Sequence, residues 1–301
     1  MGTAWIAPSL VVALALVMLG LGLTLTVDDF RRLRAHPRAV VLALVLQVIV
    51  LPALCVALIA LLGVRPLYAV GLMLLAASPG GITANLFSHL FGGHVAMNLS
   101  LTAINTVLSI VTLPLIANWA IDFYAGGGQV VPLQFAKVAE VVAIIGVPVA
   151  VGMVLRAHRS RFADRMERPM KIFSALVLLA IAVLAIAKEW EALTSSFAEI
   201  GTAVVAFNVL SLAAGYALSR LARLPRPVPG AISFELGIHN STLAIFLALS
   251  VLQQFALALP AALYSGSMYV TAALFGMWLA RTAPAPVNGQ PGGTGPSPAA
   301  D

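Results

Sequence analysis

The sequence predicts an all-α polytopic membrane protein with nine transmembrane helices. Of its 301 residues, 61% are hydrophobic and only 9% are charged, whereas about a quarter of the residues in a soluble domain are charged. The mean hydropathy of the chain is +1.01. The polar stretches between the apolar runs are too short for a separate catalytic domain. We therefore expect a protein that acts within the membrane and is not an enzyme.

Nine apolar runs account for the expected helices, because about 20 apolar residues are needed to cross a bilayer as a helix. The runs cover residues 4–26, 39–62, 67–91, 95–124, 132–155, 170–187, 199–220, 228–252 and 257–280. We expect one transmembrane transporter domain over residues 1–283, with a first half at 1–125 and a second half at 130–283. Residues 284–301 are rich in Pro, Gly, Ser and Ala, which predicts a disordered cytoplasmic tail.

The basic residues predict how the chain is oriented. No Lys or Arg precedes the first run, which is too long for a signal-peptide core, so we expect a retained helix with the N-terminus outside. In that topology every Lys and Arg except Arg65, Lys137 and Lys188 falls on the cytoplasmic side, as the positive-inside rule requires. The formal charge of +6 then reflects insertion in the cell (inner) membrane, and we expect no nucleic-acid partner and no obligate protein partner.

Two of the nine runs contain helix-breaking residues near their centres. The third run contains Ser78-Pro79-Gly80-Gly81, and the eighth contains Gly237 within a dense polar segment. Counted from an outside N-terminus, the third run crosses inward and the eighth crosses outward. This predicts an inverted repeat whose two discontinuous helices meet at the bilayer midplane. Because four spans precede the second half and five compose it, one repeat would lack its first helix. A simple bend at each site is the alternative.

Polar side chains at membrane depth point to a cation site. The carboxylate of Glu235 lies near the centre of a span, where it costs about 2.5 to 3.5 kcal/mol, so a ligand or partner should offset that cost. One face of the fourth run carries Asn98, Thr102, Asn105, Ser109 and Thr112. Gln47 and Asn85 add further neutral oxygens, and such donors suit a hard cation such as sodium. Helix-to-helix hydrogen bonding is the alternative role for the polar face.

Three ordered motifs resemble those of the bile acid:sodium symporter family. They are Pro79-Gly80-Gly81-Ile82-Thr83-Ala84-Asn85, His94-Val95-Ala96-Met97-Asn98-Leu99-Ser100-Leu101-Thr102 and Glu235-Leu236-Gly237-Ile238-His239-Asn240-Ser241. The resemblance covers nearly all of the membrane domain and indicates a bacterial member. It implies a panel domain and a six-helix core domain, the latter with two crossing broken helices, two sodium sites and a substrate cavity.

The resemblance also implies the ligands of these sites. At the first sodium site it places Asn85, Asn98, Thr102 and Glu235. At the second it places Gln47, Glu235, His239 and the carbonyls of Leu236 and Ile238. It places Asn240 toward the substrate, and we expect Thr83, Asn105 and Ser241 beside it. Asn208 and Tyr269 are further candidates for the substrate pathway.

Two positions depart from the family pattern. Ala84 stands where a serine hydroxyl would help to bind the first sodium ion, although Thr83 or a water molecule can substitute for it. His239 replaces a glutamine whose amide oxygen would bind the second ion. Because imidazole is a poor sodium ligand and titrates near neutral pH, proton coupling is a rival to sodium coupling at this site. A purely structural hydrogen bond from His239 is the remaining alternative.

Together these features predict a sodium-coupled symporter of an organic anion, either bile-acid-like or a small carboxylate, that works by alternating access. A proton-coupled or sodium-independent organic anion carrier is one alternative. An arsenite efflux carrier of related architecture would use a cysteine in its broken helix, whereas Cys55 lies away from both breaks. A channel would need a continuous polar path. The sequence does not select among the organic anions.

Overall fold

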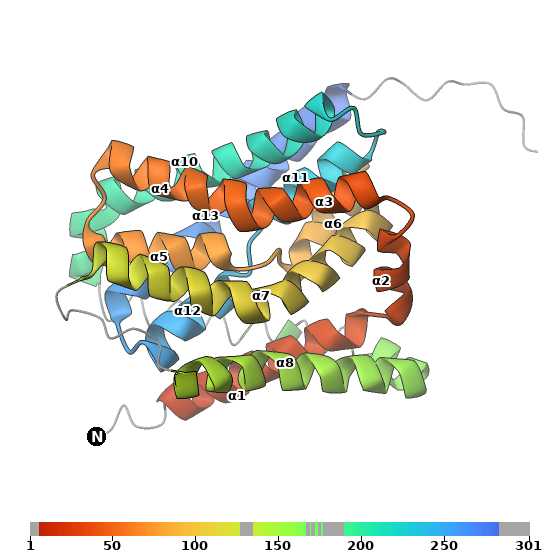
Figure 1. Ribbon diagram of the computed structural model, residues 1–301, viewed down its shortest axis with the longest axis horizontal. Coiled ribbons are helices and arrows are strands. Elements are labelled where there is room, and N and C mark those ends of the chain that lie inside the picture. Colours follow the sequence, from red (N-terminus) through yellow and green to blue (C-terminus); the bar gives the residue numbers. More distant parts are fainter. Residues whose placement is uncertain are drawn as a thin grey trace, which may run out of the picture.

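The computed structural model describes residues 6–126, 135–166 and 190–282, together with residues 169, 172, 173 and 176. Over these residues the regular elements are helices (Figure 1). In chain order they are α1 (Ile6–Thr24), α2 (Val27–Leu33), α3 (Pro37–Val45), the π-helical turn η2 (Leu46–Val50), α4 (Leu51–Leu62), α5 (Pro66–Ala77), α6 (Ile82–Leu90), α7 (Val95–Tyr124), α8 (Phe135–His158), α10 (Trp190–Leu221), α11 (Val228–Gly237), α12 (Ser241–Phe246), the π-helical turn η3 (Leu247–Val251) and α13 (Phe255–Thr282).

Within the described part of the chain, five helices are long and apolar enough to cross a membrane. They are Pro37–Leu62, Val95–Tyr124, Val141–His158, Glu199–Leu221 and Phe255–Thr282, and each coincides with a predicted apolar run. The first predicted run corresponds to α1. The runs at 67–91 and 228–252 each divide into shorter helices. The predicted run at 170–187 lies almost entirely outside the described residues, and the tail at 284–301 lies wholly outside them.

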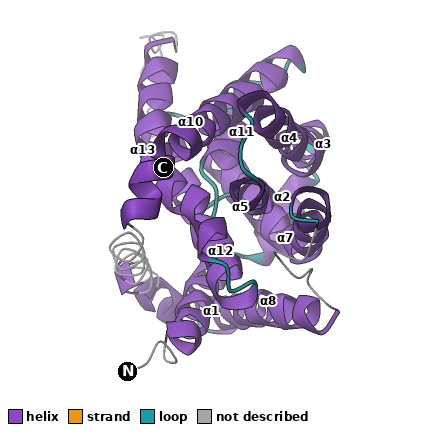
Figure 2. Ribbon diagram, turned by 90° about the vertical axis from the view of Figure 1, so that its left-hand side faces the viewer, coloured by secondary structure: helices purple, strands orange, loops and turns teal. Residues whose placement is uncertain are grey.

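The described helices form two groups. Helices α1 and α8 lie side by side along one side of the molecule, and the remaining long helices form a larger bundle around α5 (Figures 1 and 2). The α1–α8 pair is close because Gly22 and Gly152 face each other, and a Cβ on Gly152 would lie 2.8 Å from the Gly22 Cα atom. The pair touches the bundle where α1 meets α12 and η3 and where α8 meets α7.

The two broken spans cross in the middle of the bundle. Helix α5 ends at Ala77 and α11 ends at Gly237, and they approach the crossing from opposite ends of the molecule (Figure 1). There Gly80 and His239 form an antiparallel β-bridge. The Gly81 N–H donates to the Ile238 carbonyl at 2.7 Å, and the Asn240 N–H donates to the Pro79 carbonyl at 2.8 Å. Each broken helix thus satisfies backbone groups of the other, which the interior of a bilayer demands.

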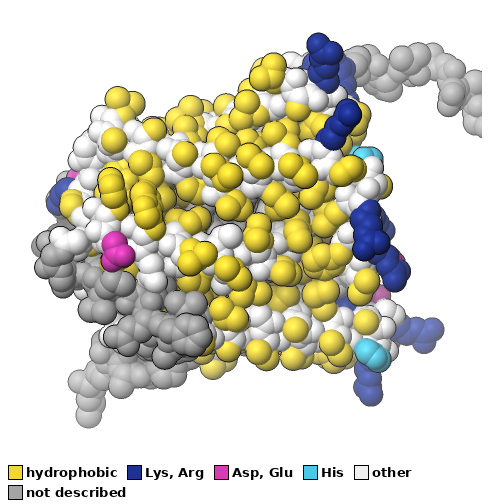
Figure 3. All heavy atoms as spheres, viewed as in Figure 1, with side chains coloured by type: hydrophobic (Ala, Val, Ile, Leu, Met, Phe, Trp, Pro, Cys, Tyr) yellow, Lys and Arg dark blue, Asp and Glu magenta, His cyan; other side chains and the backbone are white. Residues whose placement is uncertain are grey.

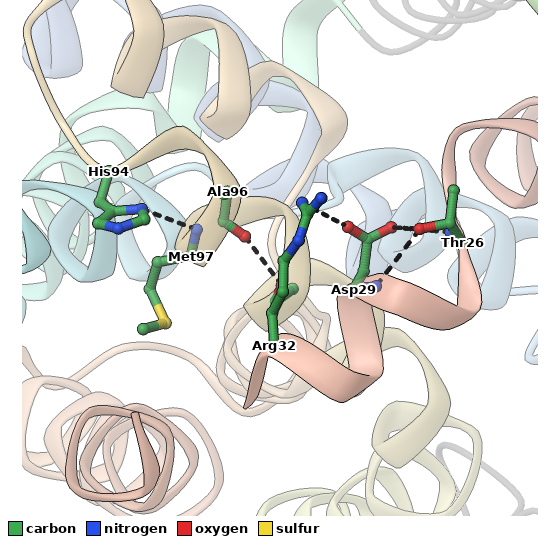
Figure 4. A network of polar contacts seen from close by, with 7 residues as sticks. Thr26, Asp29, Arg32, His94, Ala96 and Met97 are labelled. Carbon is green, nitrogen blue, oxygen red and sulfur yellow. Dashed lines mark hydrogen bonds and ion pairs between the residues drawn. The ribbon is translucent and has the colours of Figure 1, made fainter. Parts of the chain in front are cut away.

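A short ordered helix, α2, connects α1 to α3. Asp29 is 1% exposed, and its Oδ2 atom accepts hydrogen bonds from the Thr26 N–H at 2.8 Å and from Thr26 Oγ1 at 2.7 Å. The Asp29 N–H donates back to Thr26 Oγ1 at 3.3 Å, which completes a capping box. Figure 4 shows this box beside the start of α7, where His94 Nδ1 accepts from the Met97 N–H at 3.1 Å. Helix α2, which links α1 to the bundle, also packs against α7.

The surface has the division of polarity expected of a protein embedded in a bilayer. Hydrophobic side chains cover the middle of the molecule, and most Lys and Arg side chains on the visible face gather at one end (Figure 3). Large apolar side chains are exposed on the long helices, such as Leu115 of α7 at 64% and Val270 of α13 at 61%. Exposure of this kind fits lipid rather than water.

Candidate functional site

Glu235, on the last turn of α11, lies at the centre of the helix crossing and is fully buried. Its Oε2 atom accepts a hydrogen bond from Thr102 Oγ1 at 2.6 Å, and its Oε1 atom accepts one from Asn105 Nδ2 at 3.0 Å. The backbone of Gly80 lies directly against the carboxyl group. Hydrogen bonds to a charged group are worth about 1.5 to 3 kcal/mol each, which is comparable to the cost of the carboxylate at this depth. These donors are uncharged, so the negative charge of the ionised acid is solvated but not neutralised.

The glycine at position 80 is what allows the acid to lie against the crossing. A Cβ atom built on Gly80 would overlap the carboxyl group of Glu235. Any other residue there would displace the acid or the backbone of the broken helix. The Pro-Gly-Gly segment therefore does more than interrupt the helix, because it also makes room for the charged group.

The amide oxygen of Asn98 lies beside Thr102, the residue that donates to the Glu235 carboxylate. The Asn98 Nδ2 atom donates to the carbonyls of Ala84 at 3.2 Å and Ala231 at 3.1 Å and to Ser88 Oγ at 2.5 Å. With the two hydrogens of Nδ2 shared among these three acceptors, the Oδ1 atom faces the other way and lies 3.5 Å from Thr102 Oγ1. Three of the residues predicted for the first sodium site, on α7 and α11, are thus brought together. Ala84 is buried and offers only its backbone carbonyl.

Asn85, the fourth residue predicted for that site, presents an oxygen with no hydrogen-bond partner. Its Oδ1 atom is buried, although the residue as a whole is half-buried. Buried polar atoms in native proteins are nearly always paired, so an exception calls for an explanation. A bound cation is one species that would satisfy this acceptor.

Gln47 and His239, predicted for the second sodium site, meet at the carbonyl of Ser78 beside the crossing. Gln47 Nε2 donates to the carbonyls of Ala76 at 3.2 Å and Ser78 at 3.0 Å, which leaves its buried Oε1 atom without a partner. His239 Nδ1 lies 3.0 Å from the same Ser78 oxygen, and the ring stacks on Phe207 with centroids 5.7 Å apart. Because Nδ1 must carry the hydrogen in that bond, Nε2 is a buried lone pair, and it too has no partner.

Gln47 is placed by an irregular turn whose cause is visible in the sequence. It belongs to the π-helical turn η2, which is followed by Pro52 in the first turn of α4. Proline has no N–H to bond the carbonyl four residues earlier, and a π-helical turn is a common way to accommodate that loss. The widened turn lies where the polar side chain faces the crossing.

A second group of polar side chains, which the sequence did not predict to lie together, hydrogen-bonds the C-terminal end of α11. Asn208 Nδ2 and the Tyr264 hydroxyl both donate to the Gly237 carbonyl, at 2.6 and 2.8 Å. Asn208 Nδ2 also donates to the Tyr264 oxygen at 2.7 Å, and Thr271 Oγ1 donates to Asn208 Oδ1. Asn208 thus supports the end of α11, and its place in a substrate pathway stays a prediction. In the sequence, Asn208, Tyr264 and Thr271 are polar residues within apolar runs. Such residues are as typical of contacts between membrane helices as of a binding site.

The residues predicted to face the substrate lie around the crossing, and each has its own local contact. Asn240 caps α12, because its Oδ1 atom accepts from the Leu243 N–H at 3.2 Å. Ser241 Oγ donates to Met268 Sδ at 3.9 Å, and Thr83 is half-buried at the start of α6. Asn105 lies instead on the carboxylate of Glu235.

The predicted pathway residue Tyr269 is separate from this group. It is 40% exposed and stacks on Phe87, with ring centroids 6.1 Å apart. Its place in a substrate pathway stays a prediction.

The donor set at the crossing fits an alkali cation better than a transition metal. Within residues 6–126, 135–166 and 190–282, no three His, Cys, Asp or Glu side chains come together as metal ligands. The groups present are one carboxylate, amide and hydroxyl oxygens and backbone carbonyls, which are the hard ligands that sodium prefers. The second set fits less well, because the imidazole nitrogen of His239 stands among its oxygens.

The fold and this site define a multi-pass helical membrane protein whose two broken helices cross beside a buried acid. The chain belongs to the sodium bile acid symporter family, whose profile matches residues 11–196. The family resemblance predicted from the three motifs is confirmed.

Relatives of the chain include transporters of bacteria and plants. It is 26% identical over 273 residues to the uncharacterized sodium-dependent transporter YocS of Bacillus subtilis, which covers 89% of this chain and 83% of the relative. It is 28% identical over 238 residues to the probable sodium/metabolite cotransporter BASS2, chloroplastic, of Oryza sativa subsp. japonica, which covers 79% of this chain and 55% of the relative. It is 27% identical over 226 residues to the P3 protein of Mus musculus, covering 74% of this chain. The chain spans about half the length of the rice and mouse relatives, 55% and 47%.

Proposed function

We propose that the protein is a secondary active transporter that couples the movement of sodium to that of an organic anion by alternating access. The observation that carries the proposal is the buried Glu235, which is surrounded by uncharged donors and flanked by buried amide oxygens that lack partners. A sodium ion would supply the missing positive charge and satisfy the amide oxygens. Support also comes from the names of the relatives, a sodium-dependent transporter and a sodium/metabolite cotransporter.

In this proposal two groups of ligands hold sodium at the crossing. Asn85, Asn98, Thr102 and Glu235 form the first group. Gln47, Glu235, His239 and the carbonyls of Leu236 and Ile238 form the second. A cation bound in the first group would add a link among α6, α7 and α11, which already pack against one another. Binding would therefore favour the arrangement in which the two broken helices are crossed.

The α1–α8 pair and the larger bundle are the two bodies that would move. We assign the pair to a panel domain and the bundle to a core domain, within a nine-span inverted repeat over residues 1–283. Their contacts run through α12, η3 and α7, so movement at these contacts would open the crossing to one side and then to the other. The arginine-rich end would face the cytoplasm, which places the N-terminus outside a cell (inner) membrane.

The anion would bind where the second halves of the broken helices begin. Helix N-termini attract negative charge, and α6 and α12 both begin beside the crossing. Asn240, Ser241 and Thr83 lie at these helix starts, and Asn105 contacts the acid. A bile-acid-like molecule or a small carboxylate would satisfy this chemistry. If two sodium ions accompany one monoanion, the membrane potential contributes about 2.3 kcal/mol per 100 mV.

Thermal unfolding of the purified full-length protein in sodium or potassium chloride at equal ionic strength tests sodium binding. We expect sodium to raise the melting temperature and Glu235→Gln to remove that increase, because a ligand present at about 100 times its Kd stabilises by about 2.7 kcal/mol. Glu199→Gln is the matched control, since Glu199 is an acid that pairs with Arg65 at 2.8 Å, away from the crossing. Equal stabilisation by potassium, or full sodium stabilisation of Glu235→Gln, would contradict the proposal.

Uptake of labelled organic anions into proteoliposomes tests coupling. We expect uptake to require an inward sodium gradient and to disappear when potassium replaces sodium at fixed pH. Uptake that a proton gradient drives in sodium-free buffer would instead show that a proton replaces sodium. Flux that does not saturate with substrate would indicate a channel.

A further inference from the structure

A small pocket lies along α7, on the side of the crossing away from the arginine-rich end. Its polar lining consists of Gln47, Asn105, Ser109 and Thr112, and apolar side chains including Val48, Leu108 and Ile116 complete it. The three polar residues of α7 are spaced by four and three, which puts them on one helix face. The pocket has room for little more than a water molecule. Ser109 and Thr112 belong to neither of the two sodium sites proposed above.

The hydroxyl groups of this pocket have their hydrogens committed elsewhere. Ser109 Oγ donates to the Thr106 carbonyl at 2.8 Å, and Thr112 Oγ1 donates to the Leu108 carbonyl at 3.2 Å. A hydroxyl has one hydrogen and two lone pairs. Each of these groups can therefore offer only a lone pair to whatever occupies the pocket.

The two amide groups likewise leave their oxygens free. Both hydrogens of Gln47 Nε2 are used by the carbonyls of Ala76 and Ser78. Asn105 Nδ2 faces the Glu235 carboxylate, which turns the Oδ1 atom to the opposite side of the planar amide. The residues are 5% and 2% exposed, and neither Gln47 Oε1 nor Asn105 Oδ1 has a hydrogen-bond partner. Two buried acceptors without partners thus belong to residues that line one small pocket.

A pocket that presents oxygen lone pairs favours a cation or a hydrogen-bond donor such as water. An anion would meet only acceptors and is excluded by repulsion. A small cation satisfies several oxygens at once, and these neutral oxygens are hard ligands. The negative charge of Glu235 lies close by, since the amide of Asn105 contacts the acid directly at 3.0 Å and also lines the pocket.

We propose that this pocket is an additional binding site for a sodium ion, formed by Gln47, which the second proposed site shares, together with Asn105, Ser109 and Thr112. The proposal rests on the sodium-coupled function proposed above and adds a site that the ion occupies before it reaches the crossing. In the proposed topology the pocket is on the outer side of Glu235, from which sodium would arrive. Asn105 connects the two positions, because one arm of its amide contacts the acid while the other is left for the arriving ion.

Equilibrium binding of ²²Na⁺ to the purified full-length protein tests the proposal. We expect the double variant Ser109→Ala/Thr112→Val to raise the half-saturating sodium concentration at least tenfold, or to lower the amount of sodium bound at saturation. We expect Ser109→Asp to lower the half-saturating concentration, because it adds a carboxylate to the pocket. A purely structural role for Ser109 predicts weaker binding from both changes, so the opposite directions distinguish a ligand from a packing residue.

Ser100→Ala is the matched control. Ser100 is also buried on α7 and donates to a backbone carbonyl, that of Ala96, at 2.8 Å, but it does not line the pocket. We expect this variant to bind sodium within twofold of the unchanged protein. Melting temperatures in sodium-free buffer show whether each variant folds, and the single changes at Ser109 suffice if the double variant does not.

Unchanged sodium affinity and capacity in the Ser109 and Thr112 variants would overturn the proposal and assign the pocket to water. Glu235→Gln, measured in parallel, separates this failure from failure of the proposed function. If Glu235→Gln abolishes sodium binding while the pocket variants behave normally, only the additional site is wrong. If Glu235→Gln binds sodium normally, the sodium-coupled function itself is wrong.

Discussion

The hydrogen bonds from Asn208 and Tyr264 to the end of α11 allow a test of whether they position the sodium site. The Tyr264 hydroxyl donates to the Gly237 carbonyl at 2.8 Å and accepts from Asn208 Nδ2 at 2.7 Å. Tyr264→Phe deletes this hydroxyl and leaves the ring in place against Phe207 and His239. The Gly237 carbonyl keeps its bond from Asn208 at 2.6 Å, so the change removes one of two supports and does not strand a buried acceptor.

The size of the effect follows from what a hydrogen bond contributes between membrane helices. Such bonds average about 0.6 kcal/mol and reach about 1.7 kcal/mol. If the arrangement that Tyr264 stabilises is the one that binds sodium, this loss raises the half-saturating sodium concentration roughly threefold to twentyfold. The melting temperature in sodium-free buffer should fall as well, because the bond joins α13 to the end of α11.

The assay is the shift in melting temperature measured over a series of sodium concentrations at constant ionic strength. Tyr216→Phe is the matched control, because the aromatic ring of Tyr216 packs edge-on against Phe275 and Trp278 on the same side of the bundle. We expect the control to keep the sodium dependence of the unchanged protein. A Tyr264→Phe protein with a lower melting temperature and an unchanged sodium dependence would refute the idea that the support positions the site.

Two further changes test other parts of the structure. Gly80→Ala should abolish sodium stabilisation, because the added Cβ atom would overlap the Glu235 carboxyl group; sodium stabilisation close to that of the unchanged protein would contradict the geometry. Asp29→Ala should lower stability by about 0.5 to 2 kcal/mol, because it removes the buried half of the capping box on α2. Asp28→Ala is its control in thermal unfolding, since the Asp28–Arg31 pair is exposed, with side chains 66% and 73% accessible, and should contribute less than about 1 kcal/mol. Equal losses from the two aspartate changes would contradict the role assigned to burial.

Composition and local residue types were enough to predict the long helices among the described residues. Long apolar runs predict membrane helices because the bilayer core demands about 20 apolar residues and internal backbone pairing. The Ser78–Gly81 break could be predicted because Pro lacks an N–H and Gly weakens helix in any surroundings. The short helix α2 and the turn η2 were not predicted, because each is too short to show a hydrophobic pattern. Helix α2 depends on its packing against α7, and η2 depends on Pro52 in the next turn.

The candidate site was partly predictable for the same reason. Glu235 stood out because a carboxylate at membrane depth is costly wherever its neighbours lie. Its hydrogen-bond donors did not stand out equally, since Thr102 and Asn105 look the same whether they face an acid, a ligand or another helix.

The sequence alone determined that this chain is a helical membrane protein, where two of its helices break, and which buried acid requires compensation, because these follow from the cost of transferring each residue to lipid. Only the tertiary structure decided which atoms meet: Thr102 and Glu235 are 133 residues apart, and their contact depends on how α7 packs against α11. The same packing pairs Gly80 with His239 and leaves the oxygens of Gln47, Asn85 and Asn105 without partners. Pairing of this kind depends on three-dimensional packing between distant segments, and no local pattern of residues specifies it.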